Sequence, residues 1–118
     1  MNSEALVKLI AKTLDSKKGE DIVAIKISDL TTLGDYFVMA SGGSSTQVKA
    51  LAEEVEDVLA RQGIEPRRVE GTPSALWILL DYQDVIVHVF YKETREFYGI
   101  ERLWSDAPRM DLSDVLTD

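Results

Sequence analysis

The sequence predicts a fold of the α/β class with its elements in an α+β order: a mixed sheet of about five strands with flanking helices. Two observations predict it. Apolar residues recur at helical spacing in two stretches, and short β-branched or alternating runs lie between and after them. Helices and strands do not alternate strictly, which favours a mixed sheet over a parallel one. With 118 residues, 45% of them hydrophobic, the chain fits one domain with a substantial core.

The first predicted element is a helix from Ser3 to about Ser16, with Ser3 placed to cap its N-terminus. Two lysines and then Gly19 follow this segment, a pattern typical of a helix C-terminus. The apolar positions that recur at helical spacing are Leu6, Leu9, Ile10, Thr13 and Leu14. We therefore expect one face of this helix to pack against the sheet.

Two strands are predicted next, one over residues 22–27 and one over residues 36–41. The Gly-Gly pair that follows breaks the second strand. Ser44 and Gln47 have the spacing of a capping box, so a second helix is expected to begin at Ser44, and Gly63 ends it. The stripe of this helix predicted to be buried is formed by Val48, Leu51, Ala52, Val55 and Leu59.

The second half of the chain is predicted to complete the sheet. A proline and two arginines in residues 66–70 suit a short edge strand. Strong strand patterns follow at 75–80 and 85–91, and a short helix is expected at 94–98, ended by Gly99. The order is therefore α-β-β-α-β-β-β-α.

The predicted domain covers residues 1–108. Residues 109–118 are rich in aspartate, and we expect them to form an acidic, mobile tail with a helical turn near Ser113 to Leu116.

The last two strands separate by parity into two different faces if the loop between them, Asp81 to Asp84, has an even length. One face would be aliphatic, with Leu76, Ile78, Leu80, Val85, Val87 and Val89. The other would hold Trp77, Leu79, Ile86, His88 and Phe90, with Trp77 close to His88. Side chains with an apolar body and a polar tip suit a protein interface. The alternative is that both faces are covered and that Trp77 and His88 are core residues.

Composition restricts the classes of function. The chain has no cysteine and one histidine, which leaves no ordinary set of zinc ligands, and we expect no metal and no cofactor. A net charge of −8 disfavours direct nucleic-acid binding and favours a basic partner such as a ribosomal protein, unless the acidity serves solubility alone. No apolar run approaches the roughly 20 residues of a membrane span, and the N-terminus lacks a basic leader, so we expect no membrane association and a cytoplasmic location.

Catalysis is poorly supported. The segment Gly42-Gly43-Ser44 resembles the opening of a nucleotidyltransferase site, but such a site needs a carboxylate pair on the next strand. Here Glu53 and Glu54 fall on a predicted helix, and no nucleophile elbow accompanies the single histidine. We therefore predict that the protein is not an enzyme and has no catalytic residues.

Four large side chains lie close together after the last strand: Phe97, Tyr98, Leu103 and Trp104. Some of them must cover the sheet. We regard Tyr98, Leu103 and Trp104 as possible contacts with a second subunit or with the tail.

Several short segments of the sequence together resemble the ribosomal silencing factor family, RsfS, also called the Iojap family. They occur in the same order, over about residues 22–108. They are Gln47-Val48-Lys49-Ala50 after Ser41-Gly42, Asp81-Tyr82 before Asp84-Val85, Val87-His88-Val89-Phe90, and Glu101-Arg102-Leu103-Trp104. Gln83 stands where the family commonly has glycine, and residues 91–92 also depart mildly.

The resemblance implies a fold similar to the nucleotidyltransferase sheet without its catalytic site. It also implies a function: binding ribosomal protein L-fourteen on the large ribosomal subunit, which sterically blocks joining of the small subunit and represses translation under nutrient limitation. Members are often homodimers when free. By resemblance, the partner-binding residues would be Trp77, Leu79, Tyr82, His88 and Phe90. The alternatives are a catalytically active nucleotidyltransferase relative and a homo-oligomeric adaptor.

Overall fold

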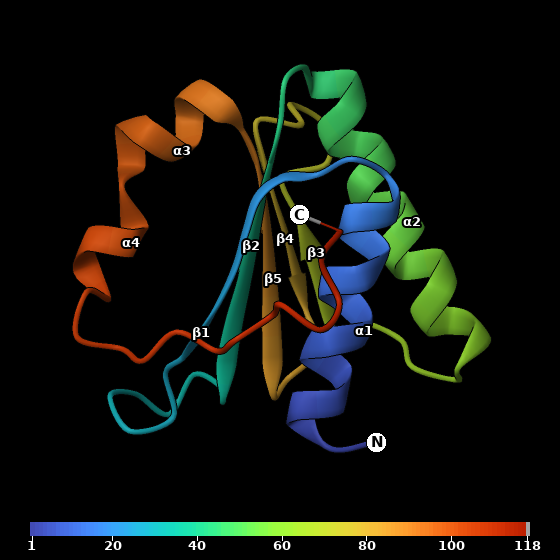
Figure 1. Cartoon of the computed structure of the whole chain (residues 1–118). Coiled ribbons are helices and arrows are strands. Elements are labelled where there is room, and N and C mark those ends of the chain that lie inside the picture. The colour runs from blue at the N-terminus through green and yellow to red at the C-terminus, as the bar shows by residue number, and fades with distance from the viewer. Residues whose placement is uncertain (118) are drawn as a thin grey trace.

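A five-stranded sheet divides the molecule into two layers of packed side chains (Figure 1). The structure is a computed structural model, and it describes residues 1–117. The strands lie in the order β1-β2-β5-β4-β3. Their bounds are β1 Glu20–Lys26, β2 Tyr36–Gly42, β3 Arg68–Glu70, β4 Trp77–Asp81 and β5 Val85–Tyr91. This arrangement confirms the predicted fold class and the position of the 66–70 segment at one edge.

The central strand, β5, is parallel to its neighbour β2, and every other pair of neighbours is antiparallel. Val38 pairs with Val87, and every residue of β2 is buried. A parallel pair needs a long connection between its strands, and here that connection contains a helix and two further strands. The centre of the sheet is therefore covered on both faces, as is usual for parallel strands.

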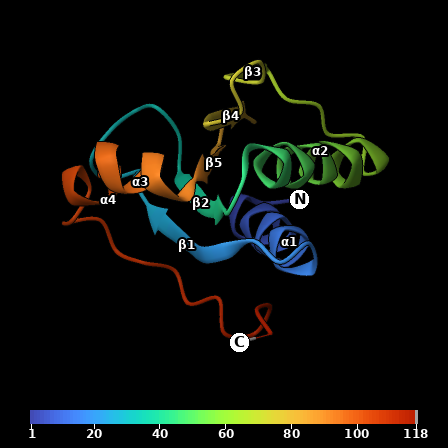
Figure 2. The same cartoon turned by 90° about the horizontal axis from the view of Figure 1, so that it is seen from above.

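Helices α1 (Ser3–Ser16) and α2 (Ser45–Arg61) cover one face of the sheet, as Figure 2 shows from above. The predicted cap of α1 is wrong by one residue: the side chain of Asn2 accepts the hydrogen bond of the Ala5 amide at 2.8 Å. The capping box of α2 is confirmed, because the Ser44 hydroxyl accepts from the Gln47 amide at 3.1 Å. The Gln47 side chain reaches back to the amide of Gly43 at 2.7 Å.

The opposite face is covered by two short helices, α3 (Lys92–Tyr98) and α4 (Ile100–Leu103). Gly99 separates the two helices. Its backbone is left-handed, with φ 53°, a conformation that residues other than glycine rarely adopt. α3 was predicted, although it begins two residues earlier than expected. α4 was not predicted, because a helix of four residues is too short to show a helical period.

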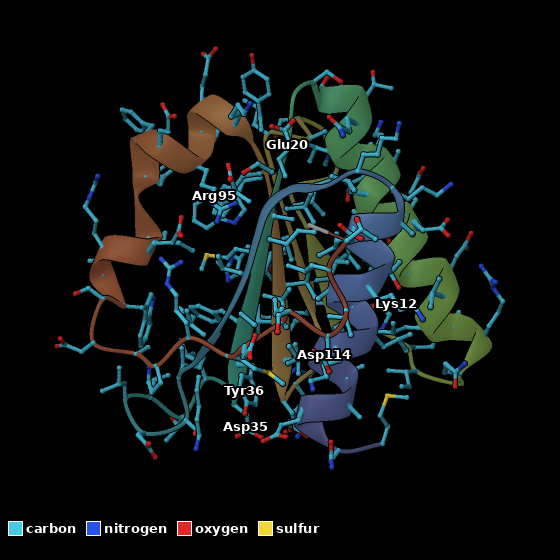
Figure 3. The ribbon with its side chains drawn as sticks, viewed as in Figure 1. Lys12, Glu20, Asp35, Tyr36, Arg95 and Asp114 are labelled. Carbon is cyan, nitrogen blue, oxygen red and sulfur yellow. The ribbon has the colours of Figure 1, made fainter. Side chains whose placement is uncertain are left out.

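The C-terminal segment differs from its prediction. We expected residues 109–118 to be a mobile tail, but residues 109–117 lie along β1 and α1. The Met110 amide donates to the carbonyl of Ala24 at 2.8 Å, and Leu112 is buried in the core with α1 and α2. Lys8 pairs with Asp114 at 2.7 Å, and Figure 3 shows Asp114 beside α1. Backbone hydrogen bonds from 115 and 116 to the Leu112 carbonyl form the predicted turn; residue 118 lies outside the described residues.

The β4–β5 hairpin confirms the parity that the sequence predicts. Trp77 pairs with Phe90 and Leu79 with His88, so these four residues share one face. The turn is stabilised by the buried carboxylate of Asp81, which accepts from the Gln83 amide at 2.8 Å and from Arg67 at 3.0 Å. β4 begins at Trp77, two residues later than predicted. Leu76 therefore precedes the alternating segment and is exposed rather than buried.

Candidate protein-interaction surface

Trp77 occupies the first position of β4, at the edge of the face that α3 covers. Its indole nitrogen Nε1 donates a hydrogen bond to Nδ1 of His88 at 3.1 Å. Its ring lies 4.9 Å from that of Phe90 and 5.0 Å from that of Tyr98, measured between ring centroids. The predicted proximity of Trp77 and His88 is confirmed. Trp77 is half-buried, so it connects the interior aromatic residues to the surface.

His88 is an interior residue, with 4% of its surface exposed. Its ring packs edge-on against Phe37 at 4.7 Å and parallel to Phe90 at 6.0 Å. Burial lowers the pKa of His88 to about 4, because the charged imidazolium would lose its hydration without gaining an anionic partner. The ring is therefore neutral near pH 7. Its Nε2 atom is enclosed and has no hydrogen-bond partner among residues 1–117.

Of the other predicted partner-binding residues, Phe90 and Leu79 lie on the same face of the sheet as Trp77, and Tyr82 lies on the opposite face. Phe90 is completely buried beneath α3, whereas Leu79 is half-buried beside Trp77. Tyr82 lies in the hairpin turn and packs into the core on the other side of the sheet. Burial, together with the nearby charges of Glu56 and Glu65, raises the pKa of the Tyr82 hydroxyl. The structure thus brings Trp77, Leu79, His88 and Phe90 together and places Tyr82 elsewhere.

The expectation that this whole aromatic face is an open interface requires correction. α3 and α4 cover it, and Trp104 extends the cover by packing edge-on against Phe37 at a centroid distance of 5.3 Å. His88 and Phe90 cannot touch a partner while these helices stay in place. Trp104 anchors the end of α4 to the sheet. Only Trp77 and Leu79 reach the rim, so the partner-binding role of the five residues stays a prediction.

Large apolar side chains are exposed on α3 itself. Phe97 is 80% exposed and Tyr98 53% exposed, and their rings meet edge-on at 5.1 Å. With Leu76 and Trp77 they form one continuous surface, which we call the α3 patch. The patch borders an open cavity of about 640 Å³, which is also lined by Ser74, Tyr91, Glu93 and Thr94.

Phe97 and Leu76 are the surface residues that the sequence prediction missed. No signal in the sequence identifies Phe97 as exposed, because α3 is short and the inward position of Arg95 is seen only in the structure. Figure 3 shows Arg95 between α3 and the sheet, which turns the two aromatic residues toward solvent.

Within the described residues no group of three histidine or acidic side chains is placed to hold a metal ion. Across the same residues, no helix has the length and apolar character that a membrane span requires. Ser44 serves as the cap of α2, and its hydroxyl is engaged with the Gln47 amide. Fold and surface together define a small α+β domain with an exposed aromatic patch suited to protein contacts.

Comparison with known proteins identifies the family of this domain. The family profile described as "Ribosomal silencing factor during starvation" matches residues 1–118. The chain is 40% identical to the ribosomal silencing factor RsfS of Halalkalibacterium halodurans over 117 residues, which cover 99% of this chain and 100% of that protein. It is 41% identical to RsfS of Bacillus subtilis over 112 residues, 95% of each chain.

A crystal structure of a protein from Chromobacterium violaceum has the same fold. It superposes with a TM-score of 0.87 at 39% identity, covering 89% of this chain and 88% of the other. The chain therefore belongs to the ribosomal silencing factor family. The predicted resemblance is confirmed.

Proposed function

We propose that this protein binds ribosomal protein L-fourteen on the large ribosomal subunit and thereby blocks joining of the small subunit, repressing translation when nutrients are limiting. The observation that carries the proposal is the α3 patch: Leu76, Trp77, Phe97 and Tyr98 are contiguous and at least partly exposed. Monomeric proteins rarely leave such a surface without a partner. Family membership supports a ribosomal component as that partner.

The exposed aromatic side chains of the α3 patch are the best suited to anchor a partner. Aromatic residues near the centre of an interface contribute more binding free energy than most of their neighbours. Phe97 and Tyr98 can lose exposed apolar surface on binding, whereas the buried His88 and Phe90 cannot. We assign His88 and Phe90 the role of supporting Trp77 from beneath, and Trp77 with Leu79 the role of direct contacts at the rim.

Charge provides the second argument. The chain carries 21 acidic and 13 basic residues, and Glu93 lines the cavity at the α3 patch. An apolar patch in an acidic protein is complementary to a basic protein with an apolar contact area. The same charge opposes attachment to ribosomal RNA, whose phosphates would repel it. A protein component is therefore the better ligand.

The mechanism requires no reaction. A bound domain of this size occupies surface that the small subunit would otherwise contact, so inhibition follows occupancy of the site. A complex worth about 12 kcal/mol would have a nanomolar dissociation constant. The action takes place in the cytoplasm, where the two ribosomal subunits meet.

Self-association is proposed for a separate feature. Leu103 on α4 is 78% exposed, lies outside the α3 patch and is available to a second copy of the chain. Trp104 is engaged with Phe37 and contributes to the position of α4 rather than to direct contact. We propose Leu103, together with Tyr98 of the α3 patch, as homodimer contacts when the protein is free of the ribosome.

The experiment that tests the function is sedimentation of the purified protein with separated ribosomal subunits, followed by a subunit-joining assay. We expect comigration with the large subunit alone and fewer joined ribosomes as the protein concentration rises. Comigration with neither subunit at low salt, where an acidic protein holds a basic partner best, would refute the proposal.

A further inference from the structure

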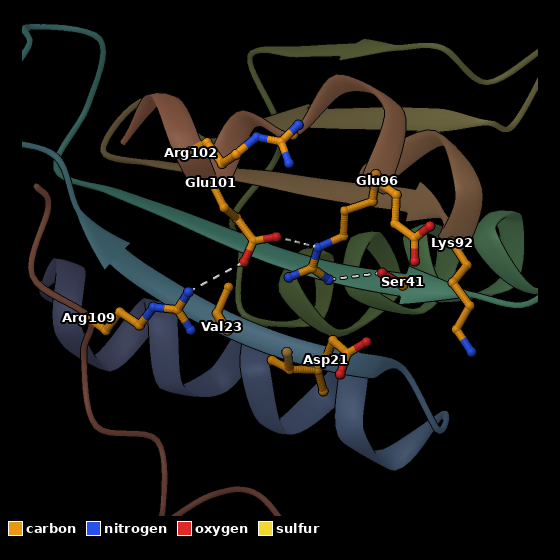
Figure 4. A pocket seen from close by; sticks show the side chains of 11 residues that line it. Asp21, Val23, Ser41, Lys92, Glu96, Glu101, Arg102 and Arg109 are labelled. Atoms are coloured by element: carbon orange, nitrogen blue, oxygen red, sulfur yellow. Dashed lines mark hydrogen bonds and ion pairs between the residues drawn. The ribbon is translucent and has the colours of Figure 1, made fainter. Parts of the chain in front are cut away.

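A second cavity lies on the other side of α3 and is separate from the proposed ribosomal contact. Its volume is about 560 Å³, and it opens between β1, the end of β2, α3 and α4 (Figure 4). α3 presents residues 92, 95 and 96 to this cavity, which Gly99 also lines, but residues 93, 94, 97 and 98 to the cavity at the α3 patch. These two sets fall on different faces of the helix.

Arg95 forms the inner wall of this cavity. Its side chain is only 9% exposed, although it comes from a helix on the protein surface. Nε donates to the carboxylate of Glu101 at 2.8 Å, and Nη1 donates to the hydroxyl of Ser41 at 2.8 Å, as the dashed lines in Figure 4 show. A guanidinium has five N–H donors, so these two bonds leave three available.

Nη2 makes no hydrogen bond among residues 1–117, yet it is not one of the enclosed unpaired polar atoms, which are Tyr82 Oη and His88 Nε2. A buried guanidinium is expected to have its donors satisfied. An unsatisfied donor that borders a cavity indicates space for an acceptor.

The charges around the cavity differ from those of the rest of the chain. It is lined by four basic residues (Lys92, Arg95, Arg102 and Arg109) and three acidic ones (Asp21, Glu96 and Glu101), a balance of +1 in a chain of net charge −8. Glu101 is shared by Arg95 and Arg109. The hydrogen bond from Arg95 and the charges of both arginines hold the pKa of that carboxyl below its usual value, although burial opposes them.

Arg102 is a positive charge without an anionic partner in the described part of the chain. Its guanidinium lies so close to Gly99 that a side chain at position 99 would collide with it. The left-handed backbone of Gly99 and its missing side chain therefore allow Arg102 to lie at the mouth of the cavity.

We propose that this cavity binds a small phosphate monoester, with Arg95 Nη2 and Arg102 as the principal ligands of the phosphate and Lys92 as an accessory charge. A guanidinium fork suits the paired oxygens of a phosphate. The volume lies within the range of about 300–1,000 Å³ that is typical of ligand sites. Ile22 and Val23 provide an apolar wall for the organic part of the molecule.

The test uses adenosine 5′-monophosphate as the probe, with adenosine and inorganic phosphate as comparisons at constant ionic strength. Binding is followed by amide chemical shifts in NMR and by thermal unfolding of the full chain. We expect the monophosphate to shift the signals of Ser41 and Gly99 and to raise the unfolding temperature. Adenosine should do neither, and inorganic phosphate should bind more weakly. Chelation of divalent ions should leave the affinity unchanged, because the phosphate ligands are side chains.

Arg102→Ala is the decisive variant, because its exposed side chain is not needed for folding. We expect it to weaken binding of the monophosphate about tenfold, the usual effect of losing one charge-assisted hydrogen bond. Arg61→Ala is the matched control: it removes the same charge from an exposed position at the end of α2. Lys92→Ala should give a smaller loss.

Three outcomes would overturn the proposal: no shifts at millimolar monophosphate, equal weakening by Arg102→Ala and Arg61→Ala, or inorganic phosphate binding as tightly as the monoester. The first outcome would mean that Arg95 has only a structural role, which is to hold α3 and α4 against β2. Ribosome binding is measured separately, so failure here leaves the proposed function untouched.

Discussion

The indole Nε1 of Trp77 and the imidazole Nδ1 of His88 are joined by a hydrogen bond of 3.1 Å between neighbouring strands. The indole nitrogen can only donate, so Nδ1 must accept, and the proton of the neutral imidazole lies on Nε2. Protonation of Nδ1 would break this bond. The pair therefore makes the position of Trp77, at the edge of the α3 patch, dependent on an uncharged His88.

The first prediction concerns pH. The folded-state pKa of His88 is about 4, against about 6.5 in an unfolded chain. As the pH falls from about 6.5 toward about 4, the unfolded chain takes up a proton that the folded protein excludes, so stability present above this range is lost within it. We expect His88 alone to lower the free energy of unfolding by about 2 kcal/mol between pH 7 and pH 5.

Urea unfolding at the two pH values, on the wild type and on His88→Gln, measures this effect. The variant keeps an acceptor for Trp77 but cannot titrate, so its loss of stability over the interval should be smaller by about that amount. Equal losses in the two proteins would show that His88 does not control the acid sensitivity.

The second prediction concerns ribosome binding. Phe97→Ser removes the most exposed aromatic side chain of the α3 patch, and we expect affinity for the large subunit to fall at least tenfold, about 1.4 kcal/mol. Sedimentation with titrated large subunits measures it. Leu30→Ser, an exposed apolar residue between β1 and β2, is the matched control and should bind like the wild type. If both variants bind normally, the α3 patch is not the contact.

Trp77→Ala should behave differently from Phe97→Ser. Trp77 packs on Phe90 and bonds to His88, so its loss should cost about 2–3 kcal/mol of stability in addition to weakening ribosome binding. The measurement compares urea midpoints with affinities of the still folded protein. A variant with unchanged stability and lost binding would show that Trp77 acts only as a surface contact.

The fourth prediction concerns the backbone before β4. Gly71 has φ 86°, and a Cβ at this position would collide with the carbonyl oxygen of Trp77. We expect Gly71→Ala to lower the free energy of unfolding by about 2 kcal/mol or more. Gly43→Ala is the control, because a Cβ there would meet only the Gln47 side chain, at 3.6 Å, and its effect should stay within about 0.5 kcal/mol. Thermal or urea unfolding separates the two.

The fifth prediction tests the docked C-terminal segment. Leu112 is buried with α1 and α2, so Leu112→Ala should destabilise the protein by about 2–4 kcal/mol. Asp114→Ala removes only an exposed ion pair with Lys8 and should change stability little. A Leu112→Ala protein as stable as the wild type would restore the interpretation of a mobile tail.

Local patterns predicted most of the fold. The Ser44–Gln47 capping box, the edge strand at β3 and the two faces of the β4–β5 hairpin were all predicted from residue spacing, because these features depend on contacts between near neighbours in the sequence. α4 and the cap at Asn2 were missed, since a single turn and a single side chain carry little periodic signal. Of the four residues of the α3 patch, the sequence singled out Trp77 and Tyr98, but not Leu76 and Phe97.

By itself the sequence determined the class of fold, the aromatic set that shares one sheet face and the family. Only the tertiary structure decided which of these side chains are exposed. The parity of a strand assigns His88 and Phe90 to a face, but whether that face meets water depends on α3 and α4, held there by Arg95 through Ser41 and Glu101. The acidity of residues 109–118 suggested mobility, yet Leu112 fits the core beside α1, because burial depends on the shape that distant elements leave open.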